Sequence, residues 1–277
     1  MKMLVLFSSL FLTLPVANAE STYIPEYLQS ISVQIIMANS KASGVVFTRK
    51  DSTKTNDISF VWTAGHAFHG TNNIVLFNMV GTNPPIVNHA NIGQRIVKDG
   101  ETAGTNIVGA ELIKLSHDED GIDIALLQLT NKFFGSNTVV FDLSEKAPRI
   151  GTPLYSVSGP FGLEGTFSEG VISRSGLNFD GNVFDQVNVI AYPGSSGGGV
   201  FSTNGECIGL INSVLAPQLG YIVPIRTIIK WAKKENLEWA INPKIEIPKT
   251  EELKQIPLYS STHTNKPPII IFELKIN

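Results

Sequence analysis

The sequence predicts an all-β protein. Short apolar runs recur along its 277 residues between turn-forming segments, and no long helices alternate with them. Charged residues make up only 16% of the chain, and its 24 glycines suit tight turns between strands. Recurring strands without intervening helices favour a barrel or a sandwich over an alternating α/β fold.

The predicted strands follow one another through most of the chain, and a single helix comes after them. Residues 227–241 carry apolar residues at helical spacing and predict a C-terminal helix. The segment that follows, 242–277, is polar and interrupted by prolines. The predicted strands cover residues 32–37, 44–48, 59–63, 73–78, 111–114, 124–129, 153–158, 170–173, 186–190, 199–201, 207–214 and 221–224.

A glycine-lined turn at residues 193–199 carries two adjacent serines, Ser195 and Ser196. Apolar runs precede and follow this turn, so it is not expected to be a flexible linker. Backbone N–H groups in such a turn can converge on one point beside a serine hydroxyl. That arrangement stabilises an oxyanion next to a nucleophile.

Two segments upstream of the turn supply a candidate base and a candidate acid. A strand-like run at 60–64 leads to His66, whose neutral imidazole could take a proton from a serine and return it to a leaving amine. Asp123 is the last carboxylate before the apolar run 124–129, where it can be buried and orient an imidazole. Taken alone, a histidine is more often an ordinary surface or core residue, and Asp123 could simply cap its strand. The carboxylates at 118–120 are expected to be solvated turn residues.

Together, the three segments resemble the catalytic motifs of trypsin-like serine proteases. Thr-Ala-Gly-His at 63–66 is similar to that family's histidine motif, and Asp-Ile-Ala-Leu-Leu at 123–127 is similar to its aspartate motif. Gly-Ser-Ser-Gly-Gly at 194–198 resembles its Gly-x-Ser-Gly-Gly motif, and the order of the three motifs is the same.

The resemblance assigns a role to each catalytic residue. It implies His66 as the base, Asp123 as the orienting acid and Ser196 as the nucleophile, with an oxyanion hole formed by the backbone N–H groups of Gly194 and Ser196. Ser195 is the only rival nucleophile, but the motif has the reactive serine directly before Gly-Gly. The expected activity is therefore that of a serine-type endopeptidase.

Further segments resemble the HtrA/Deg proteases within this family. Pro-Phe-Gly-Leu at 160–163, the run 168–173 and the segments 205–217 and 221–225 are similar to that family's sequence, so the resemblance covers about residues 30–235. Two departures occur at the serine turn. Ser195 stands where the HtrA/Deg pattern usually has asparagine, and Tyr192-Pro193 precedes the turn. These departures bear on regulation and specificity more than on the reaction type.

The resemblance makes the expected fold more specific. It implies a chymotrypsin-like pair of six-stranded antiparallel β-barrels at about 25–140 and 150–225, with the C-terminal helix packed on the second barrel. The protease domain would span 20–241 and the catalytic residues would meet in the cleft between the barrels. HtrA/Deg proteins usually carry PDZ domains after the protease, but the 242–277 extension is expected to be too short for one. Its apolar stretch at 269–274 is expected to dock on the body of the protein.

The substrate pocket is expected to be neutral. Ile190 occupies the position six residues before Ser196, which lies at the base of the primary specificity pocket in trypsin-like enzymes. Ile211, Asn212 and Ser213 follow Ile-Gly-Leu on the expected pocket wall, where glutamate-selective relatives have a histidine. We therefore expect a preference for small or medium aliphatic residues before the cleaved bond.

The N-terminus has the pattern of a secretory signal peptide. Lys2 precedes an apolar stretch at 3–16, and Ala-Asn-Ala at 17–19 is a cleavage pattern. Cleavage after Ala19 would start the mature chain at Glu20 and send it to the periplasm or outside the cell. No stable membrane insertion is expected after removal of the signal, although a retained anchor is the alternative interpretation.

Composition restricts cofactors and partners. The net charge of −3, without a basic tract, argues against nucleic acid as a partner. Cys207 is the only cysteine, so an intramolecular disulfide is impossible and a small core residue is expected there. The resemblance implies polypeptide substrates, no metal or organic cofactor, and a homo-oligomer for which Tyr23 and Tyr27 are unspecific contact candidates.

Two other functions compete with proteolysis. The first is a binding or chaperone-like module of the protease fold whose catalytic residues are unused or misassembled. The second is metal-dependent hydrolysis, because His66 and His69 are close in sequence, although no further ligands occur in a recognisable pattern.

Overall fold

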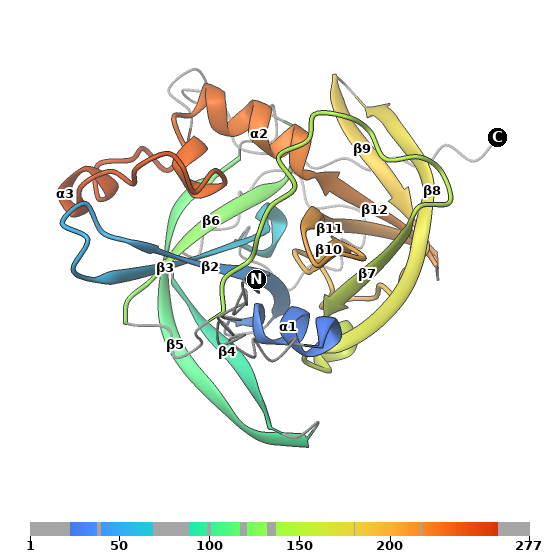
Figure 1. The fold of residues 1–277 in the computed structure, drawn as a ribbon, viewed down its shortest axis with the longest axis horizontal. Coiled ribbons are helices and arrows are strands. Elements are labelled where there is room, and N and C mark those ends of the chain that lie inside the picture. The colour runs from blue at the N-terminus through green and yellow to red at the C-terminus, as the bar shows by residue number, and fades with distance from the viewer. Residues whose placement is uncertain are drawn as a thin grey trace, which may run out of the picture.

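The computed structural model describes residues 23–37, 40–68, 89–98, 101–116, 121–131, 137–179, 181–216 and 218–259. Their strands close into two six-stranded antiparallel barrels, as predicted (Figure 1). The expected signal peptide at 1–19, the expected strand at 73–78, His69 and the apolar stretch at 269–274 lie outside the described residues.

The first barrel contains the first six strands in the order β1-β2-β3-β6-β5-β4. It closes where β1 pairs with β4, with Ile35 opposite Ile92. Both of these side chains point into the barrel and are buried. The strands are β1 (Ser32–Ile36), β2 (Lys41–Lys50), β3 (Asp57–Ala64), β4 (His89–Lys98), β5 (Glu101–Leu115) and β6 (Ile124–Leu129).

The second barrel contains the last six strands in the order β10-β11-β12-β9-β8-β7. It closes where β10 pairs with β7, with Val200 opposite Ser156. The strands are β7 (Pro153–Ser158), β8 (Thr166–Phe179), β9 (Asn182–Val187), β10 (Gly199–Ser202), β11 (Cys207–Ala216) and β12 (Leu219–Pro224).

Two helices lie where the barrels meet. Helix α1 (Ile24–Ser30) contacts β1 and β4 of the first barrel and β8 of the second. Helix α2 (Ile225–Lys234) packs on β9, β11 and β12 as predicted, and its Trp231 ring also meets Trp62 of the first barrel at 6.4 Å between centroids. Helix α2 therefore joins the two barrels (Figure 1).

Helix α2 ends earlier than the predicted residue 241. Asn236 adopts a left-handed conformation with φ 58°. The N–H of Leu237 donates to the carbonyl of Ala232 at 2.8 Å, and the N–H of Asn236 donates to Lys233 at 3.5 Å. These two bonds form a Schellman motif, which terminates the helix. A short 3₁₀ turn, η4 (Glu238–Ala240), comes next and buries Trp239.

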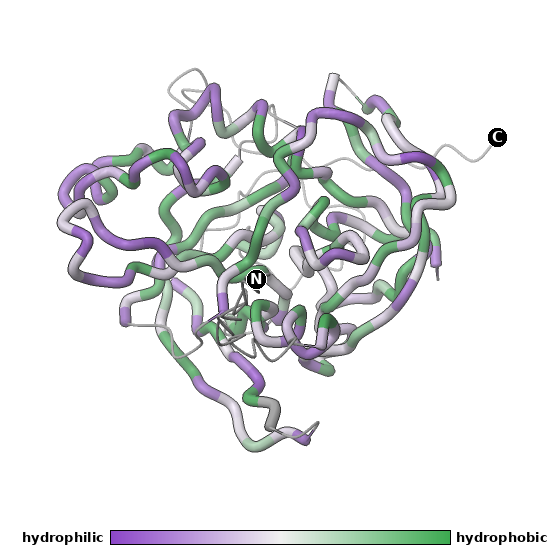
Figure 2. Tube along the Cα trace, viewed as in Figure 1, coloured by the Kyte–Doolittle hydropathy of each residue, from purple (hydrophilic) through white to green (hydrophobic). Residues whose placement is uncertain are grey.

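Hydrophobic residues line the strands of both barrels, and hydrophilic residues gather in the C-terminal segment around α3 (Thr250–Leu253) (Figure 2). In α2 the two kinds alternate, as expected of a helix with one buried face. No helix in the described part of the chain is both long enough and apolar enough to cross a membrane.

Candidate active site

His66 stands on a short 3₁₀ turn, η1 (Gly65–Phe68), directly after β3. Its Nδ1 lies 2.6 Å from Asp123 Oδ2, and its backbone N–H donates to Asp123 Oδ1 at 2.6 Å. Gly65 permits this approach, because a Cβ there would lie only 3.0 Å from Asp123 Oδ1. The His66 side chain remains 37% exposed, so its imidazole is held by the protein and reachable from solvent.

Asp123 immediately precedes β6 and has a left-handed backbone with φ 51°. Its carboxylate accepts three hydrogen bonds, the third from Asn212 Nδ2 at 2.6 Å. The negative charge of Asp123 raises the pKa of His66 above its usual value, burial opposes this shift, and the hydrogen bond to Asp123 reinforces it. The carboxylate can therefore orient the imidazole and stabilise its protonated form.

The serine turn, residues 193–199, is held by bonds of its own and by the first barrel. Within the turn, Ser195 N–H donates to the Tyr192 carbonyl at 2.8 Å and Gly198 N–H donates to the Ser195 carbonyl at 2.9 Å. From β2, Ser43 N–H donates to the Ser196 carbonyl and Ser43 Oγ donates to the Gly194 carbonyl, both at 2.8 Å. The turn is therefore fixed against the barrel that carries His66.

The two serines of the turn differ in their surroundings. Ser195 is fully buried, and its Oγ accepts hydrogen bonds from Tyr192 N–H and from Ser158 Oγ. Ser196 is partly exposed, and its Oγ makes no hydrogen bond within the described residues, including none to His66. Gly197, the next residue, packs so closely on Ala64 that a Cβ would lie 2.7 Å from the Ala64 nitrogen, two residues before His66.

The backbone around Gly194 leaves two N–H groups open. The Pro193 carbonyl accepts from the N–H of Phe161 at 2.7 Å, and the chain has no cis peptide bond among its described residues. Because N–H and C=O of a trans peptide point in opposite directions, the Gly194 N–H faces away from Phe161. Within the described residues, neither Gly194 N–H nor Ser196 N–H donates to a backbone carbonyl. Two free donors beside a serine can stabilise an oxyanion.

The four expected pocket residues do not share one environment. The Ile190 side chain is 43% exposed, whereas Ile211 is buried inside the second barrel. The amide of Asn212 is bonded to Asp123, a contact that its expected pocket position did not suggest. Ser213 is half-buried on β11, opposite Tyr221.

Sequence reasoning missed Ser43 as part of the site. Its hydrogen-bond partners Gly194 and Gly159 lie 151 and 116 positions away in the sequence. A local sequence pattern around a serine on a strand does not predict such distant partners. Cys207 is buried as expected, and burial raises the pKa of its thiol to about 12. A protonated, inaccessible thiol is not a nucleophile.

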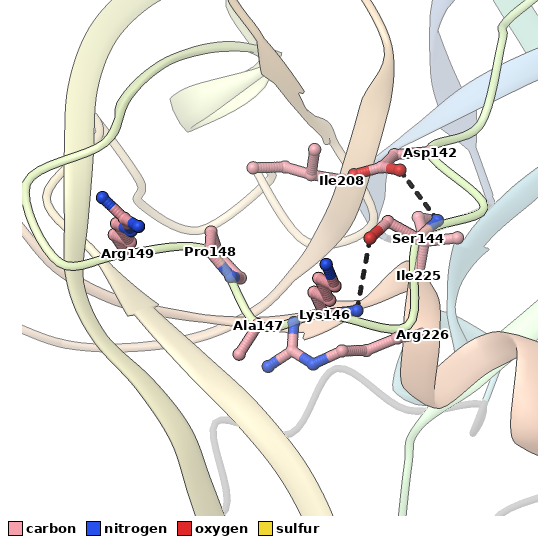
Figure 3. Close-up of a pocket in the computed structure, with 9 residues that line it drawn as sticks. All are labelled: Asp142, Ser144, Lys146, Ala147, Pro148, Arg149, Ile208, Ile225 and Arg226. Atoms are coloured by element: carbon pink, nitrogen blue, oxygen red, sulfur yellow. Dashed lines mark hydrogen bonds between the residues drawn. The ribbon is translucent and has the colours of Figure 1, made fainter.

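A hollow of about 290 Å³ lies at the connection between the barrels, away from these residues (Figure 3). It is lined by Asp142, Ser144, Lys146, Ala147, Pro148, Arg149, Ile208, Ile225 and Arg226. None of His66, Asp123 or Ser196 lines it, and the Arg226 guanidinium is already paired with Asp185 at 2.6 Å. This hollow is therefore not part of the candidate active site.

Comparisons with known proteins find similar sequences. Residues 42–210 match the family model of the trypsin-like peptidase domain. The chain is 32% identical over 170 residues to the periplasmic pH-dependent serine endoprotease DegQ of Escherichia coli K12, covering 57% of this chain and 35% of DegQ. It is 32% identical over 148 residues to the periplasmic serine endoprotease DegP of Salmonella typhimurium LT2, covering 52% of this chain and 29% of DegP. The matches span about a third of each relative's length.

Solved structures show the same fold. The crystal structure of the serine endoprotease from Yersinia pestis matches with a TM-score of 0.52 and 19% sequence identity, covering 77% of this chain and 66% of that one. At this identity the likeness concerns the arrangement of the barrels.

Proposed function

The chain belongs to the trypsin-like peptidase domain family, and we propose that it is a serine endopeptidase with Ser196 as nucleophile, His66 as base and Asp123 as orienting acid. The observation that carries the proposal is the double contact of Asp123 with His66, next to a serine turn with two open N–H groups. The 32% identity to two proteins named as serine endoproteases supports it.

The reaction can be derived from these positions. Ser196 Oγ attacks the carbonyl carbon of the scissile peptide bond while His66 Nε2 takes the hydroxyl proton. The N–H groups of Gly194 and Ser196 stabilise the oxyanion that develops on the carbonyl oxygen. The C–N bond then breaks, His66 gives its proton to the leaving amine, and water hydrolyses the acyl-enzyme by the same proton relay. Apart from the hydrolytic water, these steps use the side chains and backbone of the protein.

The proposal extends to substrate, location and domain limits. The substrates are polypeptides with small or medium aliphatic residues before the cleaved bond, because Ile190 offers no charge at the pocket base. The leader at 1–19 is removed after Ala19, and the domain at 20–241 with its extension 242–277 acts in the periplasm or outside the cell. The two relatives named as periplasmic support this location. A peptide-library profile dominated by Arg, Lys or Glu would contradict the specificity.

One observation favours a second candidate, a catalytically latent protease-fold binding module. His66 and Ser196 make no hydrogen bond to each other in the described site, so the nucleophile is not engaged by its base. Hydrogen bonds of this kind often tighten only when substrate binds, and we therefore rank the active protease first.

Labelling with a fluorophosphonate probe distinguishes the two candidates. The purified protein is expected to be labelled at Ser196, and His66→Ala and Ser196→Ala are expected to abolish labelling. Ser195→Ala is the matched control, because that neighbouring hydroxyl is buried and already hydrogen-bonded. If folded native protein is not labelled, the latent module becomes the better description.

A further inference from the structure

Three side chains beside the serine turn form an apolar surface that the reaction described above does not use. We propose that Phe161, Leu163 and Tyr192, here called the apolar shelf, bind a large apolar or aromatic side chain of the substrate on the leaving-group side of the scissile bond. This inference rests on the proposed endopeptidase function, and it adds a preference for the type of residue after the cleaved bond.

The shelf is exposed although it is apolar. Phe161 is 67% exposed and Leu163 is 65% exposed, while Tyr192 is half-buried. The rings of Phe161 and Tyr192 lie against each other with centroids 4.8 Å apart and an interplanar angle of 31°. Large apolar side chains gathered on a surface typically mark a binding site, and paired rings offer a flat face to a third apolar group.

The shelf is joined to the serine turn through backbone hydrogen bonds to Pro193 and Ser195. Phe161 lies in the 3₁₀ turn η3 (Pro160–Gly162), and its N–H holds the Pro193 carbonyl at 2.7 Å. Tyr192 holds the turn from the other side, since its carbonyl and its N–H bond to the backbone and to the hydroxyl of Ser195, respectively. Phe161 also keeps a left-handed backbone with φ 52°, which is unfavourable for a bulky residue. The ring is thus presented outward at the serine turn.

Contacts to β2 indicate which side of the scissile bond the shelf faces. A Cβ on Gly162, between Phe161 and Leu163, would lie 3.3 Å from Lys41 Cδ at the start of β2. Strand β2 pairs with β3 in the register Gly44 opposite Thr63, so its start at Lys41 runs toward His66. His66 gives its proton to the leaving amine, so substrate residues after the scissile bond lie on this side.

The position of the shelf beside the serine turn indicates that the substrate chain itself covers it. A substrate chain bound at Ser196 brings its own side chains next to the shelf without a further partner, because Tyr192 directly precedes the serine turn and its N–H donates to the Ser195 hydroxyl. A large apolar or aromatic side chain would cover Phe161 and Leu163, removing their apolar surface from water. Phe161 and Leu163 belong to the Pro-Phe-Gly-Leu motif that resembles the HtrA/Deg sequence, whereas Tyr192 departs from the HtrA/Deg pattern. The ring that Tyr192 adds to the shelf is therefore the part that distinguishes this chain.

The test uses internally quenched peptides that are identical up to the scissile bond. Each of the first three positions after the bond carries Phe, Leu, Ala or Asp in turn. For native protein, kcat/KM is expected to be about tenfold higher for Phe than for Ala at one of these positions, because the Phe ring buries apolar surface and packs on the paired rings. In Leu163→Ser and in Tyr192→Ser, the ratio of Phe to Ala is expected to fall to about twofold, each ratio being taken within one protein. Ile150→Ser is the matched control, because Ile150 is 71% exposed in the connection between the barrels and is expected to keep the native ratio.

The outcomes separate the two proposals. Fluorophosphonate labelling and hydrolysis of a p-nitroanilide substrate, which ends at the scissile bond, establish the chemistry of the native protein. Suppose that native protein is labelled and cleaves the p-nitroanilide substrate. A Phe-to-Ala ratio near one in native protein, or a ratio that stays high in both shelf variants, would then contradict the proposed role of the shelf and leave the proposed endopeptidase function intact. If the ratios are unchanged in the variants and the native protein self-associates in a way that Leu163→Ser abolishes, this surface is a contact between copies of the chain. That result would also contradict the proposed substrate-binding role of the shelf. If native protein is neither labelled nor active, both proposals fail.

Discussion

The two barrels are built alike but stabilised differently. The interior of the first barrel continues without a break into α2 and the C-terminal segment, which contributes Ile247 and Leu253 to the same buried cluster. The second barrel encloses a separate, smaller cluster, which comprises Leu154, Ile172, Val187, Val189, Ala191, Val200, Ile211 and Ile222. The first barrel therefore shares one buried cluster with second-barrel residues such as Phe201 and Leu210 and with residues that follow the second barrel in sequence, whereas the smaller cluster contains second-barrel residues alone.

The C-terminal segment is fastened to the first barrel by polar contacts as well. The Arg49 guanidinium on β2 donates to carbonyls of Trp239, Asn242, Pro243 and Ile245. At the end of β5, the N–H of Leu115 donates to the Leu258 carbonyl at 2.9 Å. The next residue, Ser116, bonds to Ile124, the neighbour of Asp123. The segment thus supports the hairpin from which the candidate acid emerges.

The candidate catalytic groups depend on the two barrels in a different way. His66 and Asp123 both come from the first barrel and bond directly to each other. The serine turn belongs to the second barrel but takes its shape from Ser43 on β2 of the first. The candidate base and acid therefore both come from the first barrel, although Asn212 of the second barrel donates to the Asp123 carboxylate. The turn that carries the candidate nucleophile requires both barrels.

The largest expected effect comes from the buried ion pair between β5 and the residue after α2. Lys114 Nζ lies 2.8 Å from Glu235 Oε2 and donates to the Pro257 carbonyl at 3.0 Å, and the two side chains are only 3% and 6% exposed. Lys114→Met would leave the Glu235 carboxylate buried without its cation, so we expect the free energy of unfolding to fall by about 3–5 kcal/mol. Urea denaturation measures this change, and tryptophan fluorescence reports it because Trp62, Trp231 and Trp239 lie in the buried cluster of the first barrel.

Two further variants sharpen this result. Lys114→Met/Glu235→Leu removes both charges and is expected to regain most of the lost stability. Lys50→Met breaks an exposed pair with Asp57 on the same barrel and is expected to cost no more than about 1 kcal/mol. A loss below about 1 kcal/mol in Lys114→Met would mean that the C-terminal segment does not stabilise the first barrel in this way.

The next effect concerns the contact between the serine turn and the first barrel. Gly197 has φ 81°, and an added Cβ would collide with Thr63 Oγ1 and the Ser43 carbonyl. Gly197→Ala is expected to reduce the free energy of unfolding by about 2–4 kcal/mol, from overpacking and from the left-handed backbone together. Gly181→Ala is the matched control, because Gly181 has φ 89° but nothing within 4 Å of the added carbon. Calorimetry measures the loss in free energy of unfolding of both variants, and the difference between them is the cost of the collision. Equal losses in the two variants would show that the turn is not packed tightly on the first barrel.

Much of this molecule can be predicted from its sequence, and the exceptions have physical causes. The catalytic motifs and the barrel strands are local patterns. The strands predicted a barrel or a sandwich, and the resemblance of the motifs to trypsin-like proteases implied the two six-stranded barrels that the structure has. Strand β4 was not predicted, because its buried residues include Gly93 and Gln94, which do not continue an apolar run in the sequence. Strand β8 extends to Phe179 beyond the predicted 170–173, because its outer part pairs with β9 while remaining largely exposed.

The candidate site was likewise only partly predictable from the sequence. His66, Asp123 and Ser196 were indicated by short motifs, and the structure brings the first two into contact. The Asn212–Asp123 bond joins residues 89 positions apart, and Phe161 reaches Pro193 through its backbone. Contacts of this kind depend on how the barrels pack, and no pattern within one segment encodes them.

The smallest expected effect is the pH dependence of the His66–Asp123 pair, whose two residues both come from the first barrel. The charge of Asp123 raises the pKa of His66, so the base is expected to lose its activity by protonation at a pH above the ordinary histidine value of about 6.5. In a profile of kcat/KM against pH, activity should therefore rise through a midpoint above about 6.5. Activity is expected to rise with pH, whereas the stability contributed by the His66–Asp123 pair is expected to fall with pH. A raised pKa in the folded state stabilises the fold below about pH 6.5, and this stabilisation is lost as pH rises through the pKa of His66 in the folded protein. NMR titration of the His66 ring, identified by its absence in His66→Gln, should give the same midpoint as the kinetic profile. A midpoint at or below about 6.5 would mean that Asp123 does not hold the proton on His66, and the acid and base would then not act as one unit.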